Sequence, residues 1–306
     1  MKTIVVGLGV QGDKRRRAAA SDYVGSVDPV NMQADFRSVE EAPLHTYDAA
    51  LVCVPDEPKF ELLRYLLRNG KHVLVEKSLW VTRDSDIAEL EALACRHNAA
   101  IYTAYNHRFE PHFARMRNLI ASGQLGKIYS CRMFYGNGTA RLVRDSAWRD
   151  TGAGVLPDLG SHLLDICRFW FGDVTDTFRV IAANRFENKA PDHVIIGTEQ
   201  HAPRLELEMT LCMWRNHFTC DIMAEKGSAH IASLCKWGPS TFIHRQRVLP
   251  SGRPIEEVLT VPEGDPTWDL EYAYFKDLCG KKAPADLSND RWLQTTLRRL
   301  GAEVAP

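Results

Sequence analysis

Residues 3–12 read TIVVGLGVQG, a β-rich apolar run that leads directly into the pattern G-x-G-x-x-G. In a strand–turn–helix unit, the first glycine permits a tight turn and the second lets a pyrophosphate approach the backbone. The third lets the helix pack closely on the strand, and the helix N-terminus favours phosphate charge. The segment therefore predicts dinucleotide binding by Gly7, Gly9, Val10, Gln11 and Gly12. The alternative is a glycine turn that only packs a helix on a sheet.

Asp28 ends the next short β-like run, residues 23–27. It lies about 20 residues after the glycines, where an acidic residue accepts hydrogen bonds from a ribose and repels a 2′-phosphate. No arginine stands among residues 29–31. The cofactor prediction is therefore NAD in preference to NADP, with both left open.

The first third of the chain alternates apolar runs with helical patterns. Such alternation predicts parallel βαβ units and a doubly wound sheet. Val54 and Pro55, at the end of one run, are assigned to the cofactor side of that sheet. The expected strands are residues 3–6, 23–27, 49–54, 72–75 and 100–105, and the expected helices are residues 56–69 and 87–95.

The pattern changes after about residue 108. Residues 205–213 alternate apolar and polar side chains, which is typical of an antiparallel strand with one buried face. Further strands are expected over residues 127–135, 217–223, 228–235 and 256–261, and helices over residues 111–123, 157–171, 266–279 and 288–300. We therefore expect a dinucleotide-binding domain over residues 1–108 and a second domain over residues 109–306.

Composition narrows the function classes. Apolar residues make up 45% of the chain, charged residues 25%, and the formal net charge is −1. This is typical of a globular protein and gives no electrostatic case for a nucleic-acid or membrane partner. The opening MKTIVVGLG does not resemble a secretory leader, so a cytoplasmic location is expected. The eight cysteines form no C-x-x-C pair, and no metal site is expected. Residues 14–17, KRRR, are interpreted as the solvated face of the first helix.

Two further segments carry candidate acid–base groups. Glu76-Lys77-Ser78 follows the strand 72–75, and the carboxyl ends of parallel strands line the ligand crevice. Asp158 and His162 are four residues apart, hence on one helical face, a pairing suited to acid–base chemistry. An exposed lysine, a capping aspartate and a structural histidine remain the alternatives.

GLGVQG, EKS at 76–78 and GAGVLPDLGSHLLD at 152–165 together resemble the glucose–fructose oxidoreductase/inositol dehydrogenase (Gfo/Idh/MocA) family. The resemblance implies an N-terminal Rossmann domain and a C-terminal α+β domain with a large open, mostly antiparallel sheet. It makes Lys77, Asp158 and His162 the catalytic residues and places Glu76 and Lys77 beside the cofactor. Candidates for the substrate side are Tyr105, Asn106, His107, Arg108, Trp148 and Arg149, with Tyr135 and Arg144 as further sugar-binding groups.

The resemblance implies a hydride transfer between NAD(P) and a ring hydroxyl or keto group of a sugar, nucleotide sugar or cyclitol. His162 would be the base and Lys77 would stabilise the reacting oxygen, although the two roles could be exchanged. Family members often form dimers or tetramers through the open sheet. Two other functions stay open, an NAD-retaining glycoside hydrolase acting by transient oxidation and a catalytically idle NAD-binding protein.

Four positions depart from the family pattern. Ser78 replaces a proline that can be cis, and a serine there is expected to be trans. Asp56 and Lys59 stand where members often have asparagine and histidine. Ala153 replaces one glycine of the usual pair.

Overall fold

The computed structural model describes residues 1–146, 149–199, 203–281 and 285–304. The chain folds into two compact units. Unit 1 comprises Met1–Asn106 and Pro266–Gln294, and unit 2 comprises His107–Asp265 and Thr295–Pro306. The predicted division into residues 1–108 and 109–306 differs from this grouping mainly in residues 266–294, which join the first unit.

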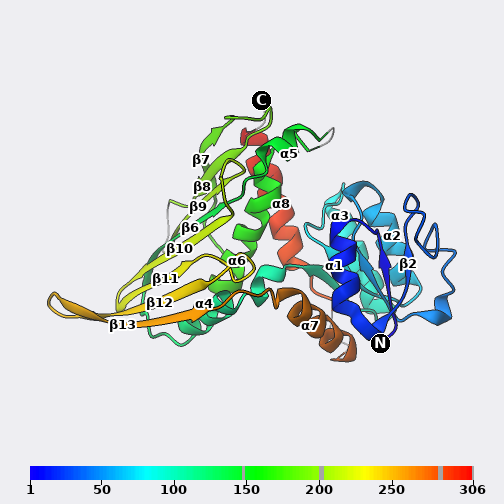
Figure 1. The fold of residues 1–306 in the computed structure, drawn as a ribbon, viewed down its shortest axis with the longest axis horizontal. Helices are drawn as coiled ribbons and strands as arrows, with labels where there is room; N and C mark the ends of the chain where they lie inside the picture. The colour runs from blue at the N-terminus through cyan, green and yellow to red at the C-terminus, as the bar shows by residue number, and fades with distance from the viewer. Residues whose placement is uncertain (147–148, 200–202, 282–284, 305–306) are drawn as a thin grey trace. The chain divides into compact units, whose positions relative to one another are not determined.

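Unit 1 is built around a parallel sheet with the order β2-β1-β3-β4-β5 (Figure 1). Its strands are fully or largely buried because helices cover both faces, which explains their continuous apolar sequences. The strands are β1 (Thr3–Val6), β2 (Tyr23–Val27), β3 (Ala49–Val52), β4 (His72–Glu76) and β5 (Ile101–Ala104), and the helices are α1 (Val10–Ala19), α2 (Asp56–Arg68), α3 (Asp84–Arg96) and α7 (Thr267–Lys281). This confirms the predicted doubly wound parallel sheet.

The two faces of this sheet have separate cores. On one face, Leu63 and Leu66 of α2 and Ile87 of α3 pack with the strands. On the other face, Tyr272 and Phe275 of α7 pack with Ala19 of α1. Because α7 completes the second core, the segment that begins at residue 266 belongs with unit 1.

Unit 2 contains an eight-stranded sheet with the order β13-β12-β11-β10-β6-β9-β8-β7 (Figure 1). The β6–β9 pair is parallel and the other pairs are antiparallel. Its strands are β6 (Ile128–Gly136), β7 (Arg179–Asn184), β8 (His193–Gly197), β9 (Arg204–Thr210), β10 (His217–Ala224), β11 (Gly227–Ala232), β12 (Ser240–Val248) and β13 (Gly252–Val261). The predicted large, mostly antiparallel sheet is confirmed.

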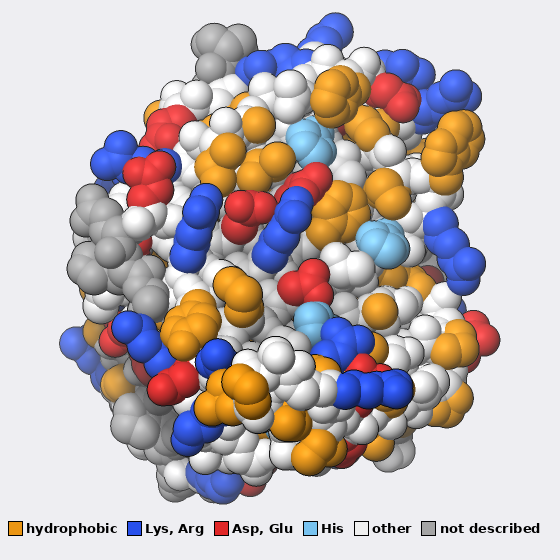
Figure 2. Space-filling view, turned by 90° about the vertical axis from the view of Figure 1, so that its left-hand side faces the viewer, with side chains coloured by type: hydrophobic (Ala, Val, Ile, Leu, Met, Phe, Trp, Pro, Cys, Tyr) orange, Lys and Arg blue, Asp and Glu red, His pale blue; other side chains and the backbone are white. Residues whose placement is uncertain are grey.

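Helices accompany one face of this sheet. They are α4 (Pro111–Ala121), α5 (Ala140–Arg144), α6 (Ser161–Phe171), preceded by the π-helical turn η4 (Leu156–Gly160), and the C-terminal part of α8 (Ser288–Val304). The opposite face carries intermingled basic, acidic and apolar side chains (Figure 2). Along β10, for example, Phe218, Cys220 and Ile222 are buried, while Asp221 and Met223 are exposed.

Three strands of this sheet are absent from the sequence-based assignment. β7 and β8 are short, and β7 lies at the sheet edge with half-exposed side chains. β12 places the polar residues Ser240 and His244 at buried positions beside Phe242. The apolar/polar alternation that identifies a half-buried strand is therefore masked in β12.

Candidate functional site

The glycine turn has the geometry that its pattern predicts. Gly7 has φ +92°, and a Cβ there would lie 2.4 Å from the carbonyl oxygen of Cys53. A Cβ on Gly12 would lie 1.9 Å from the carbonyl oxygen of Gly7, which accounts for close packing of α1. A Cβ on Gly9 would meet nothing within 4 Å. The open space at Gly9, at the N-cap of α1, fits the approach of a pyrophosphate.

Asp28 fastens the glycine turn to the end of β2. Its Oδ2 accepts the Leu8 N–H at 2.8 Å, and its Oδ1 accepts the N–H groups of Val30 and Asn31 at 2.9 and 2.8 Å. Burial alone would raise the pKa of Asp28, but these three donors and the nearby Arg37 outweigh burial and hold the pKa below its ordinary value. Asp28 is therefore ionised, and its carboxylate holds the glycine turn in place. Only some of its hydrogen-bond acceptor positions remain for a ligand.

A pocket of about 470 Å³ opens beside Asp28, at the carboxyl ends of β1, β2 and β3. This is where a doubly wound sheet receives the adenosine half of a dinucleotide. Pro55, predicted to lie on the cofactor side, is the N-cap of α2. The apolar part of the lining includes Val6, Val27, Pro29, Val39, Val54, Pro58 and Leu62.

Two buried cations hold the segment that carries Lys77. The Lys59 ammonium donates to the carbonyl oxygens of Glu76 and Ser78 at 3.4 and 3.1 Å and pairs with Asp56 Oδ1 at 2.6 Å. Lys59 is 2% exposed. Arg15 Nε lies 2.6 Å from Glu76 Oε1. The Lys77–Ser78 peptide is cis, in contrast to the trans bond expected for serine.

Arg15 corrects the interpretation of residues 14–17. Its side chain is 1% exposed, its Nη1 lies 2.6 Å from Oε2 of Glu271, and its guanidinium stacks on Trp268. The run KRRR is therefore not uniformly exposed to solvent. One of its arginines, Arg15, is buried in an ion pair with the Glu271 carboxylate of α7. Nothing in the local sequence distinguishes Arg15 from its neighbours.

In unit 2, four elements bring the second group of candidates together. His162, in the first turn of α6, stacks on His107 with ring centroids 4.0 Å apart. Lys236 Nζ lies 3.1 Å from His107 Nε2. Because an ammonium can only donate, His107 accepts this hydrogen bond. Tyr135, at the end of β6, packs against the same histidines.

Asp158 lies on η4, the turn that leads into the first turn of α6 and His162. Burial, first, and the Asp158 carboxylate, second, raise the pKa of Tyr135. The Tyr135 hydroxyl therefore stays protonated and able to donate a hydrogen bond. Arg149 Nη2 lies 3.5 Å from Asp158 Oδ2, and both side chains are partly exposed. Unit 2 thus presents a carboxylate, an imidazole, a phenol and a guanidinium in one region.

The remaining predicted site residues make the following contacts, where the structure describes them. Arg108 forms a bidentate ion pair with the buried Asp165, with Nε–Oδ2 at 2.9 Å. Tyr105 is buried and its hydroxyl donates to Asp290 at 2.9 Å, while Asn106 Nδ2 donates to Thr267 Oγ1 at 3.2 Å. Trp148 lies outside the described residues. Arg144 ends the short helix α5.

Several residues of these clusters carry no recognisable sequence signal. Lys236 and Trp237 lie in the loop after β11, and Trp237 packs on Tyr135 with centroids 5.7 Å apart. Glu110 is 1% exposed and accepts the Cys235 N–H at 3.0 Å. The pairing of β6 with β10 and of β10 with β11 brings these loops to the first turn of α6.

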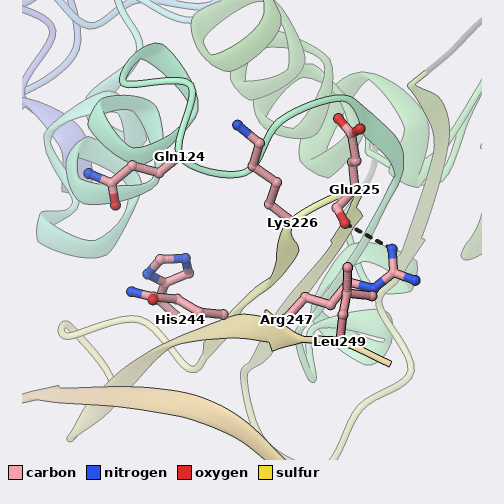
Figure 3. A pocket seen from close by; sticks show the side chains of 7 residues that line it. Gln124, Glu225, Lys226, His244, Arg247 and Leu249 are labelled. Atoms are coloured by element: carbon pink, nitrogen blue, oxygen red, sulfur yellow. Dashed lines mark hydrogen bonds between the residues drawn. The ribbon is translucent and has the colours of Figure 1, made fainter. Parts of the chain in front are cut away.

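A separate pocket of about 530 Å³ lies elsewhere in unit 2 (Figure 3). It is formed by the loop after α4, the β10–β11 turn and β12, and Arg247 Nη1 donates to the carbonyl oxygen of Glu225 at 3.1 Å (Figure 3). The pocket includes none of the predicted site residues. Among the described residues, no three His, Cys, Asp or Glu side chains are grouped to hold a metal ion. No helix in the described ranges is both long and apolar enough to cross a membrane.

Family models match both halves of the chain. Residues 2–105 match the oxidoreductase family with an NAD-binding Rossmann fold, and residues 113–230 match the Gfo/Idh/MocA C-terminal domain. The chain belongs to the Gfo/Idh/MocA family. The resemblance stated from the sequence is thereby confirmed, and the N-terminal match is to an oxidoreductase family with an NAD-binding Rossmann fold.

Curated relatives of this Gfo/Idh/MocA protein include proteins named levoglucosan dehydrogenase and inositol 2-dehydrogenase. The uncharacterized oxidoreductase YdgJ of Escherichia coli is 31% identical over 49% of this chain and 45% of its own length. Levoglucosan dehydrogenase of Pseudarthrobacter phenanthrenivorans is 28% identical over 50% of this chain and 40% of its own length. Inositol 2-dehydrogenase of Rhizobium meliloti is 25% identical over 49% of this chain and 41% of its own length. The matches therefore span less than half of each relative.

Solved structures share the fold over nearly the whole chain. Levoglucosan dehydrogenase in complex with NADH superimposes with a TM-score of 0.83 at 15% identity and covers 100% of this chain and 98% of that chain. GenD2 from gentamicin A biosynthesis in complex with NAD has a TM-score of 0.74 at 19% identity, with coverage of 99% and 94%. At such identities the comparison establishes the fold.

Proposed function

We propose that the protein is an NAD(P)-dependent dehydrogenase or reductase that interconverts a CH–OH and a C=O group on a sugar, nucleotide sugar or cyclitol. The observation that carries this proposal is the Arg15–Glu76 ion pair. It joins the helix after the glycine turn to the segment that presents Lys77. Binding of a dinucleotide and placement of the candidate catalytic lysine are therefore coupled within one unit.

Each step of the proposed chemistry has a residue suited to it. A bound nicotinamide dinucleotide would supply the hydride acceptor or donor. The backbone at Gly9 and the N-terminus of α1 would bind its pyrophosphate, and Asp28 its adenosine ribose. Lys77 would donate a hydrogen bond to the reacting oxygen and stabilise its developing negative charge.

The acid–base residues of this proposal lie in unit 2. His162 would take the hydroxyl proton in oxidation and return it in reduction, as imidazoles do near neutral pH. Asp158 would orient a substrate hydroxyl or His162. Tyr135, Trp237 and Arg149 offer an aromatic surface and planar donors, which suit a sugar ring.

Thermal unfolding with NAD, NADH, NADP and NADPH, followed by a panel of sugars, cyclitols and nucleotide sugars, tests the proposal. A ligand that binds only the native state stabilises it by about 2.7 kcal/mol at 100 times its Kd. We expect a dinucleotide to raise the melting temperature and one substrate class to raise it further and to change A340. No shift, with no cofactor released on denaturation, would contradict the proposal.

The same assay distinguishes the two alternative functions. A hydrolase that retains NAD would release a glycoside product without added dinucleotide and without net NADH. An idle NAD-binding protein would be stabilised by the dinucleotide but show no turnover with any substrate class.

We also propose that the outward face of the eight-stranded sheet joins two copies of the chain. It combines ion pairs, such as Arg132 with Glu206 at 3.0 Å, with exposed apolar side chains, such as Met223 at 57% exposure. A face of mixed charge and apolar groups suits a self-complementary interface. The mass of a Met223 variant in solution tests this interface.

A further inference from the structure

Arg37 lies beside Asp28 although nine positions separate them in the sequence. The chain turns back after β2, so that Asp28 N–H donates to the carbonyl oxygen of Phe36 at 3.1 Å and Phe36 N–H donates to that of Ser26 at 3.0 Å. This pairing puts Arg37 and Ser38 at the end of β2. Both residues line the 470 Å³ pocket that we assign to the adenosine half of the cofactor.

The Arg37 side chain is held in place without a carboxylate partner in the described part of the chain. Nη1 donates to the carbonyl oxygen of Asn31 at 2.9 Å and Nη2 contacts Met32 Sδ at 3.6 Å. Both groups are uncharged. The guanidinium therefore keeps its full positive charge and further N–H donors for a ligand.

The other charged groups of the lining are mostly paired. Arg64 lies 2.7 Å from Glu61 and 2.7 Å from Glu89, and Arg68 lies 3.5 Å from Glu89. Three further negative groups lie near Arg37: Glu40 in the lining, Asp28, and Glu41, whose Oε2 accepts the backbone N–H of Arg37 at 2.8 Å. Of the three arginines that line the pocket, Arg64 and Arg68 are thus paired with carboxylates. Arg37 is the one whose charge is available to a bound anion.

Asp28 repels a 2′-phosphate less strongly than an acidic residue at this sequence position usually does. A carboxylate has about four acceptor positions, and backbone N–H groups occupy three of them on Asp28. Those dipoles and Arg37 offset part of its negative charge. Asp28 retains one acceptor position for a ribose hydroxyl, which suffices for NAD but does not exclude NADP.

Ser38 adds a second donor to the lining of the same pocket. Its side chain is half-buried and lines the same pocket. An arginine fork together with a hydroxyl provides the charge-assisted and neutral hydrogen bonds that a phosphate monoester takes. We propose that Arg37 and Ser38 form a subsite for the 2′-phosphate of NADP(H), so that the protein binds NADP(H) at least as tightly as NAD(H). This inference rests on the proposed dinucleotide site.

Equilibrium titration with NADH and NADPH, followed by nicotinamide fluorescence, tests the subsite without any substrate. We expect the Kd for NADPH to equal or fall below that for NADH. Arg37→Gln should weaken NADPH binding by about 10- to 100-fold, the loss of one or two charge-assisted hydrogen bonds, and NADH binding by less than about twofold. Ser38→Ala should weaken only NADPH, by about threefold to tenfold.

Two controls make the result specific. Arg96→Gln removes the same charge from the exposed end of α3 and should change neither Kd. Retained NADH binding shows that Arg37→Gln is folded, and 2′,5′-ADP should compete better than 5′-AMP in the wild-type protein only. Tight NADH binding with a Kd for NADPH above that for NADH would overturn the subsite and leave the proposed function standing. No binding of either dinucleotide would overturn both.

Discussion

Oε2 of Glu271 lies 2.6 Å from Nη1 of Arg15, and both side chains are at most 1% exposed. The pair joins α7 to the helix that follows the glycine turn. Arg15 also contacts Glu76, so one guanidinium serves two carboxylates. Burial, first, and the second carboxylate of Glu76 raise the pKa of Glu271 to about 7, although Arg15 opposes this rise. α7 therefore supports the helix of the proposed cofactor site.

This raised pKa predicts a pH-dependent stability. Because the folded protein binds the Glu271 proton more tightly than the unfolded chain, the stabilisation is complete below about pH 4.5 and is lost as the pH rises through 7. Between pH 5 and 8, the free energy of unfolding of the wild type should fall by roughly 3 kcal/mol relative to Glu271→Gln. Urea unfolding at each pH measures the free energy of unfolding of both proteins. The same pH dependence in the wild type and in Glu271→Gln would contradict the prediction. Glu61→Gln, at an exposed carboxylate, should retain the wild-type slope.

Replacement of Lys77 should separate cofactor binding from turnover. Lys77→Ala and His162→Asn are each expected to lower kcat by about 10²- to 10⁴-fold, the usual contribution of a positioned acid–base group. The Kd for NADH should change by less than about threefold. Steady-state kinetics and fluorescence titration give both numbers, with Lys226→Met in the pocket of Figure 3 as a control. Undiminished turnover in either variant would refute the assigned role.

Lys59 should act on turnover through the backbone of the Lys77 segment. Lys59→Met removes the donor to the carbonyl oxygens of Glu76 and Ser78 and leaves Asp56 unpaired. A displaced reacting group lowers rates steeply, so we expect kcat to fall by about 10- to 100-fold. Lys59→Arg, which retains the charge and donors, should recover part of this loss. A loss of stability with unchanged kcat would indicate a structural role alone.

Met223 offers a test of the proposed interface between copies of the chain. It is 57% exposed at the outward face of β10. Met223→Lys would add an ammonium near Arg132 and Asp221, and this ammonium would be buried if the face joins two copies. Light scattering should give a dimer or tetramer for the wild type and a smaller species for the variant. Ser122→Lys, on the exposed loop after α4, should leave the mass unchanged. A monomeric wild type would rule out this interface.

Features that depend on neighbours along the chain were predicted from the sequence, and features that depend on distant residues were not. Gly7, Gly9 and Gly12 act through local backbone geometry, so their spacing alone indicated the turn. The apolar runs of β1, β3 and β4 are buried on both faces, and this leaves a continuous signature. β12 was not predicted because the buried Ser240 and His244 interrupt its pattern.

The sequence by itself determined the parallel sheet, the glycine turn, the position of Asp28 and the family, because each depends on neighbours along the chain. Only the tertiary structure decided that Arg15 is buried, that Arg37 stands beside Asp28, and that Lys236 contacts His107. These cations look alike in sequence. Their roles depend on which distant carboxylate, carbonyl or imidazole the fold brings within hydrogen-bonding distance, and no local pattern encodes that partner.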